Sequence, residues 1–208
     1  MPIKLKVCGM RDNRNVLEVA SSRPDFMGFI FYEKSPRYVG LNFKIPDDLD
    51  ARIQWVGVFV NENVKTIIKL VSKHRLDFVQ LHGDESPNEC RELKENRIGV
   101  IKVFSVDDDF DFGIVNAYQS VVDYFLFDTK GKARGGNGVV FNWNLLKNYE
   151  GDVPFFLSGG IDPENVNLIK ELNHKQLFAI DVNSGIEIAP GVKDISKLNL
   201  LIKHKLCW

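Results

Sequence analysis

Residues 155–166, Phe155-Phe156-Leu157-Ser158-Gly159-Gly160-Ile161-Asp162-Pro163-Glu164-Asn165-Val166, contain a short apolar run, two glycines and an Asp-Pro step. The apolar run predicts a buried parallel strand, and the glycine pair predicts a turn with accessible backbone N–H groups. Asp162 and Pro163 have the pattern of an N-cap and a first helical residue. A helix N-terminus favours phosphate, because its free N–H groups and its dipole both attract negative charge. The alternative is a turn that needs glycine only for its backbone angles.

Short apolar runs alternate with polar, helix-period segments about every 25 residues, which is typical of repeated βα units. The expected strands are 3–8, 26–31, 54–60, 78–82, 100–104, 124–128, 155–158 and 178–182. The expected helices are 12–21, 42–49, 63–74, 86–95, 108–119, 142–149, 163–172 and 194–205. Eight βα units predict an α/β fold, a (βα)8 TIM barrel, as a single domain over residues 1–208. An open doubly wound sheet is the alternative, but the first strand is not followed by GxGxxG.

The composition indicates a small molecule as the partner. The chain has 208 residues, 44% of them hydrophobic, and a formal net charge of −1 with acidic and basic residues interleaved. This balance predicts neither nucleic acid nor a membrane as a partner. We expect a cytoplasmic location, because no signal peptide is recognisable and no apolar run approaches the roughly 18 residues of a membrane span. Cys8, Cys90 and Cys207 form no CxxC pair, and we expect them to be reduced thiols.

In a (βα)8 barrel, functional residues follow the carboxyl ends of the strands. Polar residues and glycine gather at several of these positions: Cys8-Gly9, residues 32–38, residues 80–84, Asp128-Thr129-Lys130, and Asp181-Val182-Asn183-Ser184-Gly185. The opposite strand ends show no comparable clustering. The glycine-rich stretch 129–141 is expected to be a mobile cover over the site.

Side-chain alternation turns two reactive groups towards the inside of the predicted barrel. Lys4, Lys6 and Cys8 share one face of the first strand, and apolar residues share the other. The apolar face should meet the helices, so Cys8 points into the barrel mouth with Lys6 below it as a source of thiolate stabilisation. Asp128 turns inward on the sixth strand by the same rule. A thiol and a carboxyl there can form an acid–base pair; inert packing of Cys8 and loop capping by Asp128 are the alternatives.

Two glycine-bearing loops can share one phosphate group. Ser158-Gly159-Gly160 follow the seventh strand, and Asn183-Ser184-Gly185 follow the eighth. Barrels of this class frequently bind phosphate with these two loops and the N-terminus of a short extra helix. The order of the loops therefore favours a phosphate-binding type of barrel over two plain turns.

Three further side chains are candidates for substrate binding. Arg37 follows Ser35-Pro36, and its guanidinium can hold a carboxylate through two hydrogen bonds, with a solvated surface arginine as the alternative. Gln80 and His82 share one face of the fourth strand and can line the interior, where a structural histidine is as compatible as a catalytic one. No His, Cys or Asp cluster has metal-ligand spacing, so no metal is expected.

Motifs along the whole chain match one known family. They are Lys6 to Met10, Gly28 to Phe31 with Ser35 to Tyr38, Val56 to Asn61, Val79 to Gly83, Asp128-Thr129, Gly135 to Gly138 with Phe141 and Trp143, Leu157 to Gly160, and Asp181 to Glu187 continuing through Pro190, Gly191, Lys193 and Asp194. Together and in this order they resemble the phosphoribosylanthranilate isomerase family, from the first strand to the last helix.

The resemblance implies an isomerase that converts N-(5-phosphoribosyl)anthranilate to 1-(2-carboxyphenylamino)-1-deoxyribulose 5-phosphate. This Amadori rearrangement belongs to tryptophan biosynthesis and needs no cofactor or metal. By position, Cys8 would be the general base, Asp128 the general acid and Arg37 the partner of the anthranilate carboxylate. The other implied substrate-binding residues are Gly159, Gly160, Asn183 and Ser184 around the phosphate, together with Gln80, His82 and Asp181. The protein would be a monomer or a homodimer.

The sequence departs from the family pattern at two places. Asn183 stands where serine is common, and Val139-Val140 stand where a basic residue and threonine are frequent. Neither change touches Cys8 or Asp128. Two other functions stay open at this stage: a different sugar-phosphate isomerase or epimerase on the same barrel, and a non-catalytic barrel that binds phosphorylated metabolites. The related histidine-pathway isomerisation usually uses two carboxylates, so Cys8 argues against it.

Overall fold

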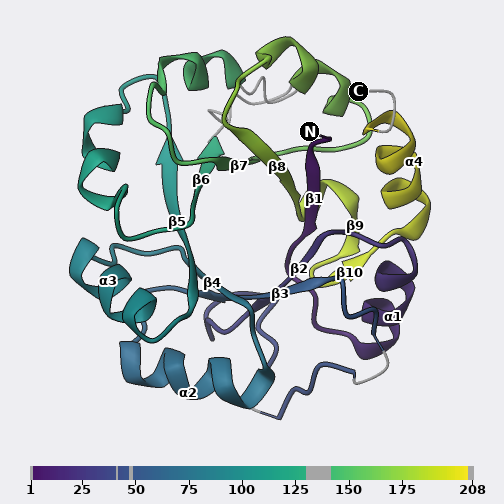
Figure 1. The fold of residues 1–208 in the computed structure, drawn as a ribbon. Coiled ribbons are helices and arrows are strands. Elements are labelled where there is room, and N and C mark those ends of the chain that lie inside the picture. The colour runs from purple at the N-terminus through teal and green to yellow at the C-terminus, as the bar shows by residue number, and fades with distance from the viewer. Residues whose placement is uncertain (1, 41, 47–48, 130–141, 206–208) are drawn as a thin grey trace.

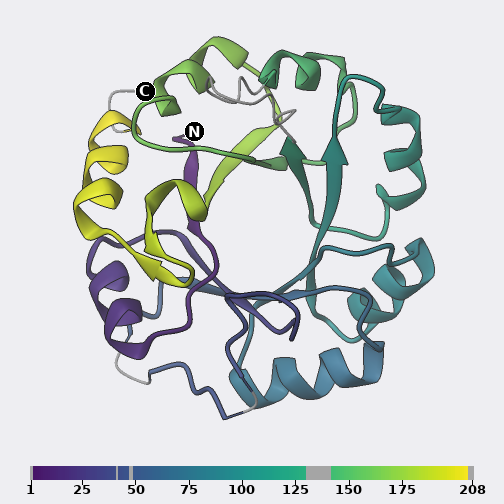
Figure 2. The same cartoon turned by 180° about the vertical axis from the view of Figure 1, so that it is seen from behind.

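Eight parallel strands form a closed barrel in sequence order, with the helices outside it (Figure 1). The computed structural model describes residues 2–40, 42–46, 49–129 and 142–205. The strands are β1 (Lys4–Val7), β2 (Phe26–Ile30), β3 (Gln54–Phe59), β4 (Phe78–Leu81), β5 (Gly99–Val106), β6 (Tyr124–Thr129), β7 (Phe155–Ser158) and β8 (Leu177–Val182). Figure 2 shows the same ring from behind. The predicted barrel is confirmed, whereas residues 130–141 of the expected cover lie outside the described residues.

Three of the α-helices begin one residue after the start of their predicted ranges, directly behind an N-cap residue. Helices α1 (Asn13–Ser21), α2 (Val64–His74) and α3 (Pro87–Glu95) follow Asp12, Asn63 and Ser86, and each of these side chains accepts a hydrogen bond from a first-turn N–H. Helix α4 (Ile195–Lys205) follows the last strands. Among the described residues, no helix is long and apolar enough to cross a membrane.

Three of the predicted helices are present in the tighter 3₁₀ form. They are η1 (Phe112–Tyr118), η2 (Trp143–Asn148) and η3 (Val166–Leu172). Each buries apolar side chains against the barrel, among them Val115, Leu146 and Val166. The hydrophobic pattern therefore predicted which face is buried, but it did not distinguish 3₁₀ from α geometry.

The helix predicted at 42–49 is wrong for the described part of that segment, because residues 42–46 and 49 are not helical. Pro46 gives the physical reason. A proline inside a helix lacks the N–H that the helix needs and clashes with the carbonyl four residues earlier. Phe43 still packs on the barrel, with its ring 5.3 Å from that of Phe29.

Side-chain alternation along the strands divides the apolar residues into two cores. Leu5 and Val7 on β1, and Phe125 and Phe127 on β6, belong to the outer core under the helices. The core inside the barrel consists of Phe26, Val56, Ile101, Val103, Leu126, Phe156 and Ala179. Leu126 turns inward, two residues before Asp128, which confirms the side-chain alternation predicted for β6.

Aromatic rings fill the end of the barrel where the strands begin. They are Phe26, Phe78, Tyr124, Phe156 and Phe178, with centroids 4.6–6.1 Å apart. Most of these pairs meet edge to face or tilted, as ring quadrupoles prefer. We call this set the aromatic floor, since it closes the barrel interior below the carboxyl ends of the strands.

A short hairpin follows the last barrel strand. After β8 the chain forms the 3₁₀ turn η4 (Ser184–Ile186) and then the antiparallel strands β9 (Glu187–Ala189) and β10 (Val192–Lys193). In Figure 1 the hairpin lies next to α1 and β2. The segment therefore connects the end of the barrel with its beginning.

Candidate active site

One cavity lies at the carboxyl ends of the barrel strands, with a volume of about 190 Å³. Its lining includes every site residue that the sequence predicted except Arg37: Cys8, Gln80, His82, Asp128, Gly159, Gly160, Asp181, Asn183 and Ser184. These residues come from strands β4, β6 and β8 and from the loops that follow β1, β4, β7 and β8. The barrel therefore brings together groups that are far apart in the sequence, at the end where its class carries out catalysis.

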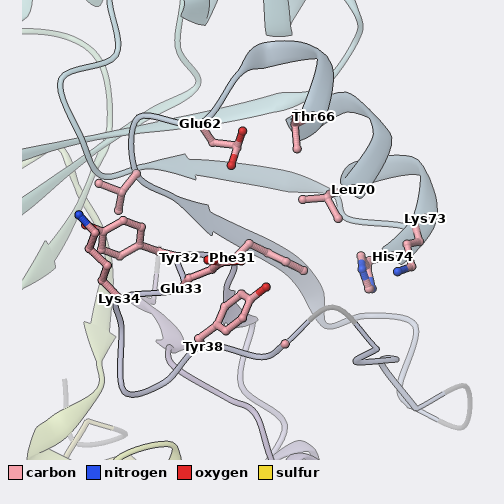
Figure 3. Close-up of a pocket in the computed structure, with 12 residues that line it drawn as sticks. Phe31, Tyr32, Glu33, Lys34, Tyr38, Glu62, Thr66, Leu70, Lys73 and His74 are labelled. Atoms are coloured by element: carbon pink, nitrogen blue, oxygen red, sulfur yellow. The ribbon is translucent and has the colours of Figure 1, made fainter.

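A larger hollow of about 370 Å³ lies outside this cavity, against α2 (Figure 3). Its walls include Phe31, Tyr38 and Leu70, with Glu62 and His74 as polar groups. None of the predicted site residues lines it. This hollow is larger than the cavity at the strand ends, but the convergent polar groups select that cavity as the site.

Cys8 is buried at the wall of the cavity, with 3% of its surface exposed. Gly28 on β2 makes room for the thiol, because a Cβ at that position would lie 2.7 Å from the Cys8 sulfur. The Cys8 N–H donates to the Val182 carbonyl at 2.9 Å, which fixes the backbone against β8. The inward direction predicted for this side chain is confirmed.

The charged groups around Cys8 have opposite effects on the pKa of its thiol. Burial raises the pKa of the thiol above its ordinary value, and this effect outweighs Lys6 and Lys193, whose charges lower it. Asp181 raises the pKa further. The sequence identified Lys6 as the nearby cation, but it did not identify Lys193. The resting form of Cys8 at neutral pH is therefore the thiol.

Lys6 and Asp181 form a buried ion pair beneath Cys8. They are register partners on β1 and β8, and Lys6 Nζ donates to Asp181 Oδ2 at 2.9 Å. The other carboxylate oxygen, Asp181 Oδ1, has no hydrogen-bond partner among the described residues, and the same is true of Gln80 Oε1. Burial raises the pKa of Asp181, while Lys6 lowers it. Asp181 and Gln80 both line the cavity, so each brings one buried acceptor without a partner to the site.

Asp128 lies across the cavity beside His82. The distance from His82 Nε2 to Asp128 Oδ2 is 3.7 Å, and Gln80 Nε2 lies 3.3 Å from His82 Nδ1. If Gln80 donates to Nδ1, the neutral imidazole carries its proton on Nε2, which faces the Asp128 carboxyl. Gln80 and His82 therefore share the inward face of β4, as predicted, and His82 contacts the predicted acid.

The two glycine loops after β7 and β8 touch each other. A Cβ on Gly185 would lie 2.1 Å from the Ile161 carbonyl oxygen, so only glycine allows this approach. Gly159 and Gly160 have φ angles of 106° and 59°, which are strained for any other residue. The loops therefore form one surface at the mouth of the cavity, as a shared phosphate site requires.

The Asp162-Pro163 step caps a turn and does not begin a helix. Asp162 Oδ1 accepts hydrogen bonds from the N–H groups of Glu164 and Asn165 at 2.8 and 2.9 Å. Helix η3 begins only at Val166. The prediction that Pro163 is the first helical residue is wrong, because the capping carboxylate stabilises a turn over 163–165 first.

Arg37 lies outside the cavity lining, beside its rim. A Cβ on Gly9 would lie 2.7 Å from Arg37 Cδ and 2.6 Å from Asn183 Oδ1, so both side chains pack against this glycine. The guanidinium of Arg37 binds Glu187 through Nε at 2.8 Å and Nη2 at 2.5 Å. Glu187 thus uses two of the five N–H donors, and the edge formed by Nη1 and Nη2 can still bind a substrate carboxylate.

No role was predicted for Gly28, Glu187 or Lys193 from the sequence. All three lie in the motifs that carry the family resemblance, and this is the feature of the sequence that could have pointed to them. The roles depend on contacts between distant parts of the chain, such as the Arg37–Glu187 pair across 150 residues. Among the described residues, no group of His, Cys, Asp or Glu is placed to hold a metal ion.

The closed barrel and its cavity define the class of this protein as a (βα)8 barrel of the TIM type, with the site at the carboxyl ends of the strands. The family model described as "N-(5'phosphoribosyl)anthranilate (PRA) isomerase" matches residues 5–204. The chain belongs to the phosphoribosylanthranilate isomerase family. The function predicted from the sequence is therefore confirmed, and the chain is an aldose–ketose isomerase of tryptophan biosynthesis.

Curated and solved relatives cover nearly the whole chain. An N-(5'-phosphoribosyl)anthranilate isomerase of Parabacteroides distasonis is 43% identical over 205 residues, which are 97% of this chain and 93% of the relative. The crystal structure of phosphoribosyl anthranilate isomerase from Thermotoga maritima matches with a TM-score of 0.85 and 36% identity, over 99% of this chain and 100% of that one. A phosphoribosyl anthranilate isomerase solved with reduced 1-(o-carboxyphenylamino)-1-deoxyribulose 5-phosphate matches with a TM-score of 0.83 and 33% identity, over 99% and 100%.

Proposed function

We propose that the 190 Å³ cavity isomerises N-(5-phosphoribosyl)anthranilate with Cys8 as general base and Asp128 as general acid. The observation that carries this proposal is that both side chains open into one cavity whose mouth is formed by the two glycine loops. A phosphate bound at these loops would place the ribose between the thiol and the carboxyl. This arrangement is what a proton transfer at each end of the sugar requires.

The first step opens the sugar ring. Asp128, in its protonated form, donates to the ring oxygen as the bond from that oxygen to C1′ breaks, and the nitrogen lone pair forms the C1′=N iminium. The carboxylate that results lies 3.7 Å from His82 Nε2. An N–H at Nε2 would stabilise the new negative charge. This gives His82 a supporting role for the acid.

The second step moves the double bond. Cys8, as thiolate, removes the proton from C2′; the electrons of that C–H bond form C1′=C2′ and neutralise the iminium nitrogen. The enolamine then loses its C2′ hydroxyl proton and gains a proton at C1′, which yields the ketone. Burial raises the pKa of the resting thiol despite Lys6 and Lys193, so the thiolate is a minor form until a further positive charge is nearby. The iminium formed by ring opening supplies such a charge.

The remaining residues bind the substrate. Gly159, Gly160, Asn183 and Ser184 surround the phosphate position at the two loops, and Arg37 holds the anthranilate carboxylate with its Nη1–Nη2 edge. Asp181 Oδ1 and Gln80 Oε1 accept hydrogen bonds from the sugar hydroxyls, which explains why these buried oxygens lack a protein partner among the described residues. Such groups reject analogues that cannot donate to them.

Substitution of the two catalytic residues tests the assignment. Cys8→Ala and Asp128→Asn should each lower turnover by roughly 10²–10⁴, the usual effect of losing a positioned acid or base. The loss of anthranilate fluorescence from freshly made substrate measures turnover. Matched controls are Cys90→Ala, which changes a buried thiol remote from the cavity, and Asp109→Asn, which changes an exposed carboxylate. Near-normal turnover in either catalytic variant would exclude that residue from its role.

Several expectations from the sequence stay predictions. They are the single domain over residues 1–208, the absence of a cofactor, the cytoplasmic location and the choice between monomer and homodimer. The family match over residues 5–204 supports the single domain. The two alternative functions, another sugar-phosphate isomerase and a non-catalytic barrel, receive no support from the comparisons.

A further inference from the structure

Lys193 on β10 is a buried cation that contacts both ends of the proposed site. Its side chain has no exposed surface. Nζ donates to Asn183 Oδ1 at 2.7 Å and to Glu187 Oε1 at 2.7 Å, and it lies 3.3 Å from the Asn183 carbonyl oxygen. Asn183 lines the cavity at the phosphate loops, whereas Glu187 holds Arg37 at the rim. One ammonium group thus connects two binding groups that do not pair directly.

The backbone of Lys193 is held in place by α1. The Asn15 side chain accepts from the Lys193 N–H at 2.7 Å and donates to the Lys193 carbonyl at 2.9 Å. Asn15 is itself buried, with 4% of its surface exposed. Because both ends of the residue are held, the ammonium group is a fixed point rather than a flexible surface charge.

Glu187 connects the fixed ammonium group of Lys193 to the guanidinium of Arg37, because its carboxylate accepts hydrogen bonds from both. Burial opposes ionisation of the Glu187 carboxyl, but the hydrogen bonds from Arg37, Lys193 and the Gly191 N–H lower its pKa to about 2. The carboxylate is therefore charged at neutral pH and is shared by the two cations. Without Lys193, Glu187 would have one partner less and more freedom to turn, and the Arg37 fork would lose its fixed direction.

We propose that Lys193 is a positioning residue that couples the carboxylate-binding end of the site, at Arg37, to the phosphate-binding end, at Asn183. This inference rests on the proposed function, since it assumes that the substrate carboxylate and phosphate bind at these two ends. Coupling of this kind means that removal of one side chain weakens two separate binding events. A structural ion pair that only adds stability would weaken neither event in the folded protein.

Two probes separate the ends of the site: inorganic phosphate and free anthranilate. Their dissociation constants are measured by isothermal titration calorimetry on folded wild type, Lys193→Met and the matched control Lys197→Met, an exposed lysine on α4. Lys193→Met should raise the dissociation constants of both probes by about fivefold or more, in the usual range of a coupling between sites. Arg37→Ala should weaken anthranilate alone, and Lys197→Met should change neither.

A double-variant cycle tests the route through Arg37. In the Lys193→Met background, Arg37→Ala should add less than about a twofold further loss of anthranilate affinity, because the arginine has already lost its fixed direction. If Lys193→Met does not fold, Lys193→Gln keeps one hydrogen-bonding arm without the charge and should show the same double loss. Additive effects in the cycle, or unchanged affinity for either probe, would overturn the inference.

Failure of the proposed function would look different. Wild-type protein that binds neither phosphate nor anthranilate would overturn the proposed function and this inference together. Wild-type protein that binds both, with a folded Lys193 variant that also binds both normally, would overturn only the coupling. Turnover is not needed for either conclusion.

Discussion

Two buried lysine–carboxylate pairs on the same barrel differ in what they leave unsatisfied. Lys102 on β5 donates to Glu85 Oε2 at 3.0 Å and to the carbonyls of Gly83 and Leu81 at 2.7 and 3.3 Å. Glu85 also accepts from the N–H groups of Asn61 and Gly83. The Lys6–Asp181 pair has a similar distance of 2.9 Å, but Asp181 Oδ1 has no hydrogen-bond partner among the described residues, and Asp181 lines the cavity.

The difference separates a pair that is satisfied within the protein from a pair that belongs to the proposed site. We call the Lys102–Glu85 pair the closed pair. It lies on the helix-facing side of the strands and holds the loop that carries His82. The Lys6–Asp181 pair, the open pair, lies inside the barrel and keeps an acceptor for a ligand. Burial alone therefore does not show what an ion pair does. The number of its unsatisfied acceptors, and the direction in which they point, is more informative.

The largest effect is expected when the closed pair is broken. Lys102→Met should lower the free energy of unfolding by about 3–5 kcal/mol, because it leaves the Glu85 carboxylate buried without its cation. Lys6→Met should cost less, since Asp181 borders the cavity and can be solvated or protonated there. Urea denaturation of the two variants measures both values. Equal losses would remove the distinction between the two pairs.

A second prediction sharpens the role of the open pair. The charge of Lys6 lowers the pKa of the Cys8 thiol, so Lys6→Met should raise that pKa. The pH profile of Cys8 alkylation by iodoacetamide should then shift to higher pH by about one unit, a tenfold lower rate at neutral pH. Peptide mapping by mass spectrometry separates Cys8 from the other thiols. Lys102→Met should leave the profile unchanged, and a shift there would contradict the comparison.

Narrowing the space beside the open pair should have a smaller effect. The Cβ of Gly28→Ala would meet the Cys8 sulfur at 2.7 Å, so the thiol must move away from its position. We expect about a tenfold loss of kcat with the fold retained, since small displacements of a catalytic group are costly. Gly40→Ala is the control, because its Cβ meets no atom within 4 Å and only its backbone, at φ +83°, is strained. That variant should lose stability but not kcat.

A third buried pair, Lys193–Glu187, gives a prediction that depends on pH. The pKa of Glu187 is lowered to about 2, well below its ordinary value of about 4.3, so the carboxylate stabilises the folded state at neutral pH. Glu187→Gln should cost about 2–3 kcal/mol at pH 7, since each unit by which the pKa is lowered is worth about 1.4 kcal/mol. Because this stabilisation is lost as the carboxylate protonates, the difference from wild type should shrink between about pH 4 and pH 2. Denaturation at stepped pH tests it, and a constant difference would rule out the ionic contribution.

The sequence predicted those features that depend on local periodicity. Cys8, Gln80 and Asp128 point inward because strand side chains alternate with a period of two, whatever the rest of the chain does. Asp12, Asn63 and Ser86 cap helices because the cap needs only the following turn. The order of the strands followed from the regular spacing of the βα units.

Other features depend on contacts that no local pattern contains. The space for the Cys8 sulfur is made by Gly28 on the neighbouring strand, and Arg37 is held by a carboxylate that arrives with the final hairpin. The helix predicted at 42–49 does not form in the described residues, because Pro46 disfavours a helix there despite the apolar spacing. Contacts between neighbouring strands, and segments whose residues favour different structures, therefore could not be predicted from local sequence patterns.

The aromatic floor has a kinetic consequence. Its five rings and the inner core fill the barrel below Cys8 and Asp128, so a molecule in the cavity faces packed side chains on that side. Substrate and product must then use the same opening, at the loop end of the barrel. Each product molecule has to leave before the next substrate enters, and product should therefore inhibit competitively, with an affinity set by the groups that hold phosphate and carboxylate in both molecules.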